Sequence, residues 1–212
     1  TVPIIYRAET PSPESTPITF IRTPSALVTL RFAEPQAIVG FINRSQRPTE
    51  NAASSDSVLL GLLDAIVDRA ADILERTAAE QESFSKAVFL TRAQGGRAAE
   101  DTLEQMVLQL GRAEDLNSRL QDSLLAMNRM LSFYNLILLE QNASRELLQR
   151  VKTLSRDVHS ISEHSGFVAH KGSFLLEATL GLVSIRQTEV IKIFSLLATI
   201  FLPPTLIASI YG

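Results

Sequence analysis

The 212-residue sequence contains no cysteine and no tryptophan. Without cysteine the chain has no disulfides and no thiolate metal sites, which fits a reducing compartment. The formal net charge is −3, so a basic surface for nucleic acid is not indicated. The sequence also lacks a glycine-rich phosphate loop and the GxSxG and HExxH motifs. We therefore expect neither an enzyme nor a bound cofactor.

Histidine is scarce, with residues only at His159, His164 and His170. A zinc site normally needs three or four converging ligands. None of these histidines is four residues from another, and cysteine is absent, so the pattern does not predict a metal site here.

Charge is absent from the last twenty residues, 193–212. About 20 apolar residues at 1.5 Å each cross the roughly 30 Å core of a bilayer as a helix. The nearest basic residues, Arg186 and Lys192, both precede this run. By the positive-inside rule, the long amino-terminal part should be cytoplasmic and the run should lie in the cell inner membrane. We expect the lipid bilayer to be a partner of the chain.

Proline is absent between Pro48 and Pro203, and this part of the chain is helical in pattern. We predict a two-helix antiparallel hairpin over 54–142, with Asp56 as a possible cap and a break at Gln94-Gly95-Gly96. A stalk helix should follow over 144–192, weakened but not stopped by Gly166 and Gly172. It should continue without a turn into a transmembrane helix over 193–212.

The second helix of the hairpin has a heptad pattern typical of a coiled coil. Asn117 occupies one seam position, where a polar residue often fixes register. The apolar positions are Leu103, Met106, Leu110, Ala113, Leu120, Leu124, Met127, Leu131, Tyr134 and Leu138.

Residues 1–50 differ from the rest, because they contain period-two and turn signals. Thr1–Glu9 has strand character, and Ile18–Arg22 should pair with a second strand across the turn Thr23–Ala26. In that second strand Val28, Leu30 and Phe32 alternate with polar residues, the pattern of a half-buried strand. A short helix should follow over 33–46. The fold class is thus α+β and mostly α, with a remnant of an α/β domain before the long helices.

Two surface patterns bear on function. Stepping along one helix face from Glu177 gives a stripe of hydroxyl and apolar residues that ends in the membrane: Ser184, Thr188, Ile191, Ser195, Ala198, Leu202, Thr205 and Ser209. Such a stripe marks either helix–helix contact, which periodicity alone favours, or a water-lined path. Asp64, Asp68, Asp72 and Glu75 share a face of the first long helix. A solvated face is the simpler interpretation of this pattern, and a loose site for a hydrated divalent cation is the alternative.

The carboxyl-terminal residues resemble the first membrane helix of the CorA family of divalent-metal ion transporters. The segment IRQTEVIKIFSLLATIFLPPTLIASIYG ends in Tyr211-Gly212, the first two residues of that family's Tyr-Gly-Met-Asn signature. The segments TPITFIRTPSALVTLRFAEP and FINRSQRP resemble the end of the family's cytoplasmic α/β domain. The resemblance covers nearly the whole chain, and we expect a piece of a CorA protein that is cut at both ends.

The resemblance implies a homopentameric channel whose stalk helices become the pore lining. The pore positions then fall on Thr188, Ile191, Phe194, Leu202 and Thr205. Ile191, Phe194 and Leu202 would form a hydrophobic gate, and Thr188 replaces an Asn often found in the family.

The same resemblance implies passive transport of Mg2+, with Co2+ and Ni2+ as further ions, gated by cytoplasmic Mg2+ that bridges subunits. Asp157 is the matching position for a regulatory metal, and Glu177 is an acidic position on the stalk. Two alternatives remain open: a zinc-transporting relative, and a membrane-anchored helical scaffold or sensor without transport.

Overall fold

The computed structural model describes residues 1–10, 12–45, 54–91 and 97–211, with side chains omitted at 89–102 and 211. The elements are the strands β1 (Val2–Ile5), β2 (Ser15–Arg22) and β3 (Leu27–Arg31), and the helices α1 (Gln36–Ser45), α2 (Ser55–Thr91), α3 (Arg97–Glu140) and α4 (Arg145–Tyr211). The predicted fold class is confirmed, because three short antiparallel strands precede four helices that dominate the chain.

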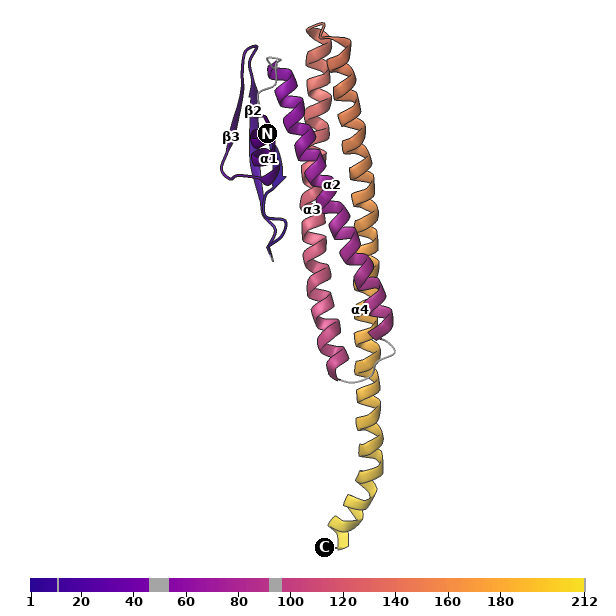
Figure 1. Ribbon diagram of the computed structural model, residues 1–212. Helices are drawn as coiled ribbons and strands as arrows, with labels where there is room; N and C mark the ends of the chain where they lie inside the picture. The colour runs from indigo at the N-terminus through magenta and orange to yellow at the C-terminus, as the bar shows by residue number, and fades with distance from the viewer. Residues whose placement is uncertain (11, 46–53, 92–96, 212) are drawn as a thin grey trace.

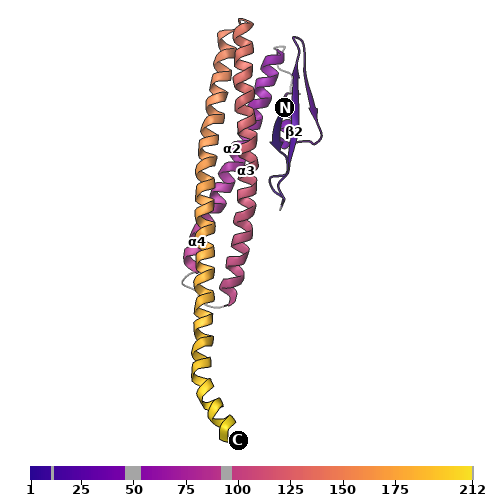
Figure 2. The ribbon, with the colours of Figure 1, turned by 180° about the vertical axis from the view of Figure 1, so that it is seen from behind.

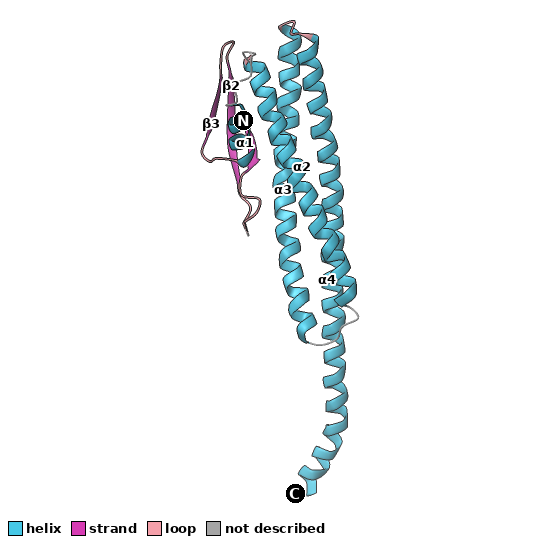
Figure 3. Cartoon of the chain, viewed as in Figure 1, coloured by secondary structure: helices cyan, strands magenta, loops and turns pink. Residues whose placement is uncertain are grey.

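The three long helices run side by side, and the sheet with α1 lies against one end of them (Figures 1 and 2). Helix α4 continues as a single helix well past the described ends of α2 and α3, and its carboxyl-terminal end lies far from the sheet (Figure 3). At 1.5 Å per residue, the 67 residues of α4 extend about 100 Å.

The sheet has the order β1-β2-β3, and β2 pairs antiparallel with β3 through Ile21 opposite Val28 and Thr19 opposite Leu30. The expectation for β3 was wrong in one respect. Val28 and Leu30 are 51% and 55% exposed, and Phe32 just beyond the strand is 82% exposed. Leu27 packs against the core instead. Alternation separates the two faces of a strand but does not say which face meets the helices.

Helices α2 and α4 each begin after a serine cap. Ser54, not Asp56, caps α2, because its Oγ accepts a hydrogen bond from the Ser57 N–H at 3.1 Å. In the same way, Ser144 Oγ accepts from the Leu147 N–H at 3.2 Å at the start of α4. The turn before it contains Asn142 with φ 49°, a left-handed conformation that Asn tolerates well. These caps fix where α2 and α4 start.

The side chain of Asp56 ties the sheet to the helices instead of capping α2. It forms an ion pair with Arg22 of β2 and accepts a hydrogen bond from the Tyr134 hydroxyl of α3. Burial and the neighbouring Asp56 carboxylate raise the pKa of Tyr134, so its hydroxyl stays protonated as a donor.

The heptad of α3 is confirmed as a buried seam, since every predicted apolar position and Asn117 are buried. However, α3 packs along α4 over a greater length than along α2. Asn117 donates to the Ser165 carbonyl of α4 at 3.0 Å and accepts from the Ser165 hydroxyl at 2.7 Å. The polar seam position therefore joins α3 to the stalk helix, because the three helices form one bundle.

Helix α4 continues through both glycines, as predicted. Gly172 has a packing role, since a Cβ added there would lie 1.6 Å from Oε1 of Glu114 and 2.7 Å from Nε2 of Gln81. The absence of a side chain lets α4 approach the polar pair contributed by α2 and α3. The predicted break at Gln94-Gly95-Gly96 lies outside the described residues.

Candidate pore-lining helix

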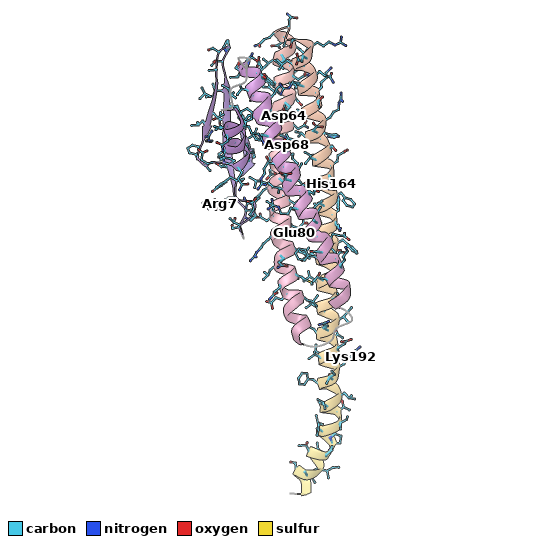
Figure 4. All side chains as sticks on the ribbon, in the orientation of Figure 1. Arg7, Asp64, Asp68, Glu80, His164 and Lys192 are labelled. Carbon is cyan, nitrogen blue, oxygen red and sulfur yellow. The ribbon has the colours of Figure 1, made fainter. Side chains whose placement is uncertain are left out.

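The end of α4 is an apolar helix that the rest of the described chain does not cover. Its most apolar window has a mean hydropathy of 2.0 and is 0% buried, and α4 is the one helix in the described part of the chain that is long and apolar enough to cross a membrane. Figure 4 labels Lys192 where α4 has left the bundle. The uncharged run starts directly after Lys192, so the apolar window lies beyond the last charged residue of the helix.

Pro203 and Pro204 lie inside α4, and the helix continues through them. Each proline lacks an N–H, so the carbonyls of Thr199 and Ile200 lose their usual helical partners. The last turns bend away from the line of the helix in Figure 1, as expected near proline. In a bilayer the freed carbonyls need a neighbouring helix or water.

The predicted pore residues all lie on the exposed part of α4. Ile191, Phe194 and Leu202 are 64%, 68% and 63% exposed, and Thr188 and Thr205 are exposed as well. At about 100° per residue, the five positions fall within about 120° of the helix circumference. They therefore form one continuous face that the chain by itself leaves uncovered.

This face points away from the bundle. The side of α4 that packs in the bundle contains Ser165, Val168, Leu175 and Thr179, all buried. By the same helical period, the predicted pore face lies about 140° around the helix from Leu175 and Thr179. The bundle therefore covers one side of the stalk and leaves most of the predicted pore side free, although Ile191 lines a groove with Leu103 and Val107 of α3.

The hydroxyls of the exposed face bond to the helix itself. Thr188 Oγ1 donates to the Ser184 carbonyl at 2.9 Å, and Ser195 Oγ donates to the Ile191 carbonyl at 2.8 Å. Thr205 Oγ1 donates to the Phe201 carbonyl at 2.6 Å. Such bonds leave the oxygen lone pairs outward, available to water or a hydrated ion.

The two acidic positions of the stalk are both exposed and far apart. Asp157 and Glu177 are separated by 20 residues of continuous helix, which corresponds to about 30 Å. The structure does not bring them together within one chain.

The four candidate carboxylates of α2 do not form a metal site, and two of them, Asp64 and Asp68, are labelled in Figure 4. Asp64 pairs with Arg150 of α4 at 3.3 Å, while Asp68, Asp72 and Glu75 are not brought to a common point. In the described part of the chain, no three His, Asp or Glu side chains converge where a metal ion would fit.

The remaining candidate residues are the two at the carboxyl end of the chain and the histidines of α4. Tyr211 is the last residue of α4, and Gly212 lies outside the described residues. His159 lies 3.5 Å from Glu163, and His164 stacks on Phe167 with ring centroids 6.3 Å apart. Both contacts are within α4.

A buried polar pair next to the stalk escaped the sequence analysis. Gln81 of α2, fully buried, donates from Nε2 to Glu114 Oε1 of α3 at 3.1 Å, beside Gly172. Burial raises the pKa of Glu114, and the bond from Gln81 only partly offsets this. Next to it, Lys171 binds Glu82 at 2.6 Å and lowers the pKa of that carboxyl. Nothing in the sequence pattern links α2 to α4 at this height.

Comparison with known proteins decides the family. The profile of the family described as "CorA-like Mg2+ transporter protein" matches residues 1–212. The chain belongs to the CorA family. That family consists of ion transporters and not of enzymes.

Curated relatives agree with this assignment. The chain is 33% identical over 170 residues to the magnesium transport protein CorA of Pasteurella multocida, covering 80% of this chain and 50% of the relative. It is 29% identical over 186 residues to the protein of that name from Haemophilus ducreyi, covering 88% and 56%. The chain thus spans about half the length of the curated relatives it matches.

Solved structures support the fold. The complete CorA magnesium transporter of Methanocaldococcus jannaschii matches with a TM-score of 0.62 at 16% identity, covering 100% of this chain and 68% of that one. The full-length CmaX protein matches with a TM-score of 0.70 at 14% identity, covering 99% and 62%.

Proposed function

We propose that this CorA chain supplies the stalk and the first membrane helix of a channel subunit for passive Mg2+ transport across the inner membrane. The observation that carries the proposal is α4, which runs unbroken from a packed bundle into an uncovered apolar span. Copies of α4 arranged around an axis would enclose a path lined by Thr188, Ile191, Phe194, Leu202 and Thr205. The resemblance favours five copies, with the amino-terminal part in the cytoplasm.

The chemistry of this face suits a hydrated ion. Mg2+ gives up its water shell reluctantly, so hydroxyl oxygens that bind water ligands are suitable partners. Ile191, Phe194 and Leu202 would close the path by dewetting when the helices are close together. Co2+ and Ni2+ are expected as further ions, and Tyr211-Gly212 would begin the outer motif that captures them.

Gating by cytoplasmic Mg2+ is part of the proposal. Asp157 is exposed on α4 and belongs to no cluster of metal-binding side chains in the described part of its own chain, so it suits an ion held between subunits. The separate acidic face of Asp64, Asp68, Asp72 and Glu75 would attract cations to the surface, and Glu177 would do so along the stalk.

The test is ion flux with the full-length protein in liposomes that contain an Mg2+ indicator. We expect Mg2+ uptake down its gradient without an energy source, and lower uptake when internal Mg2+ is raised. Leu202→Ser should hydrate the gate and raise uptake at high internal Mg2+. The matched change Leu197→Ser, about 140° around α4 from Leu202 and outside the predicted pore face, should not. Uptake of Zn2+ in place of Mg2+ would favour the zinc-transporting alternative, and no flux of any divalent ion would favour a scaffold.

A further inference from the structure

A cavity opens where the connection between β1 and β2 meets the long helices. Its volume is about 510 Å³, and residues of this connection, of α2 and of α3 line it. Figures 1 and 2 show the lower end of the sheet beside these helices from opposite sides. Pockets of about 300–1,000 Å³ are typical of small-molecule sites. Among the described residues that line the cavity, none belongs to the predicted pore face of α4.

The connection that forms one wall of the cavity is held in place by polar contacts. Glu9 forms ion pairs with Arg69 and Arg76 of α2. The Thr10 hydroxyl donates a hydrogen bond to the Arg7 carbonyl at 3.0 Å. This wall is therefore shaped before any ligand binds, which lowers the conformational entropy that binding costs.

Four charged side chains line the cavity, two of each sign: Glu9, Glu80, Arg76 and Arg112. Glu9 and Arg76 are paired with each other at 3.4 Å. Within the described residues, the side chains of Glu80 on α2 and Arg112 on α3 form no ion pair or hydrogen bond, either with each other or with a third residue. Glu80 is labelled in Figure 4. One carboxylate and one guanidinium, on two different helices, are thus left for a ligand.

Apolar side chains from all three elements complete the lining. Pro13 of the connection is buried, and Phe84 of α2 and Leu116 of α3 are half-buried. Exposed charges on an open surface are satisfied by water and indicate no ligand. Here the two unpaired charges share a cavity with an apolar surface, which is the combination that orients a small molecule.

We propose that this cavity binds a small zwitterion with an apolar side chain, of the class of an amino acid or a dipeptide. The carboxylate of the ligand binds the Arg112 guanidinium, its ammonium binds the Glu80 carboxylate, and its apolar part packs on Phe84 and Leu116. A molecule with both charges bridges two side chains that do not bind each other. A simple anion or cation would pair with only one of them, and the charges of the lining cancel, so neither sign alone is favoured.

The test is isothermal titration calorimetry with the full-length protein in detergent. The probes are L-phenylalanine and L-phenylalanyl-L-leucine, and the tighter of the two distinguishes an amino acid site from a dipeptide site. We expect saturable binding to one site per chain. No saturable binding of either probe at millimolar concentration would overturn the proposal.

Blocked forms of the better probe test the two charges of the ligand separately. Its N-acetyl form lacks the ammonium, and its C-terminal amide lacks the carboxylate. Each should bind at least about tenfold more weakly than the zwitterion, because each loses one charge-assisted contact. Equal affinity of either blocked form would mean that the site recognises one charge only, and would overturn the proposal.

Protein variants assign each charge to its partner. Arg112→Gln and Glu80→Gln should each weaken binding of the zwitterion at least about tenfold. In Arg112→Gln the amide should bind as well as the zwitterion, and in Glu80→Gln the acetyl form should do so. Arg129→Gln and Glu140→Gln, at exposed positions of α3 outside the cavity, should change nothing. Circular dichroism checks that all four variants fold, and discrimination that persists in both cavity variants would contradict the assignment.

Flux measurements separate this proposal from the transport function, on which it does not depend. Magnesium uptake by a protein that binds neither probe would refute the site and leave transport standing. Zwitterion binding by a protein without uptake of any divalent ion would refute transport and leave the site standing.

Discussion

The upper and lower parts of α4 differ in what surrounds them. From Val151 to Thr179, side chains at three- and four-residue spacing are buried against α2 and α3. Beyond Lys192, the apolar window of the same helix is 0% buried. One continuous element is therefore packed against its own chain at one end and left uncovered by it at the other. The difference teaches that helix continuity, not a domain boundary, links the bundle to the apolar span.

We expect the largest difference between the two parts of α4 when one leucine in each part is changed to alanine. Leu175 is 1% exposed, so Leu175→Ala should lower the free energy of unfolding by about 2–5 kcal/mol. Leu196 is 62% exposed, and Leu196→Ala should change bundle stability by less than about 0.5 kcal/mol. Thermal unfolding in detergent, followed by circular dichroism, measures both. Equal losses would mean that the lower part is covered within one chain.

The next largest loss of stability is expected at the buried Asn117–Ser165 pair. Asn117→Ala leaves the Ser165 hydroxyl without its buried acceptor, at a cost of about 1–3 kcal/mol. Ser195→Ala in the lower part removes only a bond to its own helix and should cost far less. Denaturant unfolding of the two single variants and of the double variant Asn117→Ala/Ser165→Ala gives the coupling energy. Additive losses would show that the pair does not act as a unit.

Alanine at two glycines of α4 should change stability by smaller amounts and in opposite directions. An alanine Cβ at Gly172 meets Glu114 Oε1, so Gly172→Ala should displace this carboxylate from Gln81 and cost about 1 kcal/mol. Gly181 has nothing within 4 Å of an added Cβ, so Gly181→Ala should stabilise the helix by about 0.5–1 kcal/mol. Melting temperatures of the two variants should shift in opposite directions. A gain at Gly172 would mean that the Gln81–Glu114 contact contributes nothing.

The pH dependence of stability should show the smallest effect. Burial raises the pKa of Glu114 in the folded chain, so the folded state binds its proton more tightly than the unfolded state does. Stability from this group is therefore present below the ordinary value of 4.5 and is lost as pH rises through the raised pKa. Glu114→Gln should remove that loss, so its melting temperature should rise relative to the wild type between acidic and neutral pH.

Glu82 is the control of opposite sign, because Lys171 lowers the pKa of its carboxyl. Glu82→Gln should be less stable than the wild type above pH 4.5, and this difference should disappear as pH falls through the lowered pKa of Glu82. Melting curves recorded from about pH 4 to about pH 8 distinguish the two carboxyls. Parallel profiles for both variants would contradict the assignment of Glu114 as a buried acid.

Much of the fold could be predicted because its signals are local. The heptad from Leu103 to Leu138 predicted the buried seam of α3, since helical period alone decides which residues share a face. The uncharged run predicted the apolar end of α4 for a similar reason. The cap of α2 was placed at Asp56 instead of Ser54, because both residue types cap well and only the backbone course selects one.

The candidate pore face could also be derived in part from sequence. Period and family resemblance placed Thr188, Ile191 and Leu202 on one side of α4, and they remain predictions about an assembly. The sequence did not predict that Phe167, Phe174 and Ile185 form an exposed apolar row on α4, although they are spaced by seven and eleven residues. The same spacing also occurs on a buried helix face. Only the burial of these side chains in the folded chain distinguishes an exposed row from a core face.

The sequence by itself determined the helices, their apolar faces and the charge-free end of α4, because these follow from short-range periodicity and composition. The tertiary structure decided the partners. It assigned the α3 seam to α4, turned Val28 and Leu30 outward, and placed Gly172 against the Gln81–Glu114 pair. It left the predicted pore side of α4 about 140° around the helix from the side that packs in the bundle. Such pairings join residues far apart in the chain, and their free energy depends on three-dimensional contacts that no local pattern encodes.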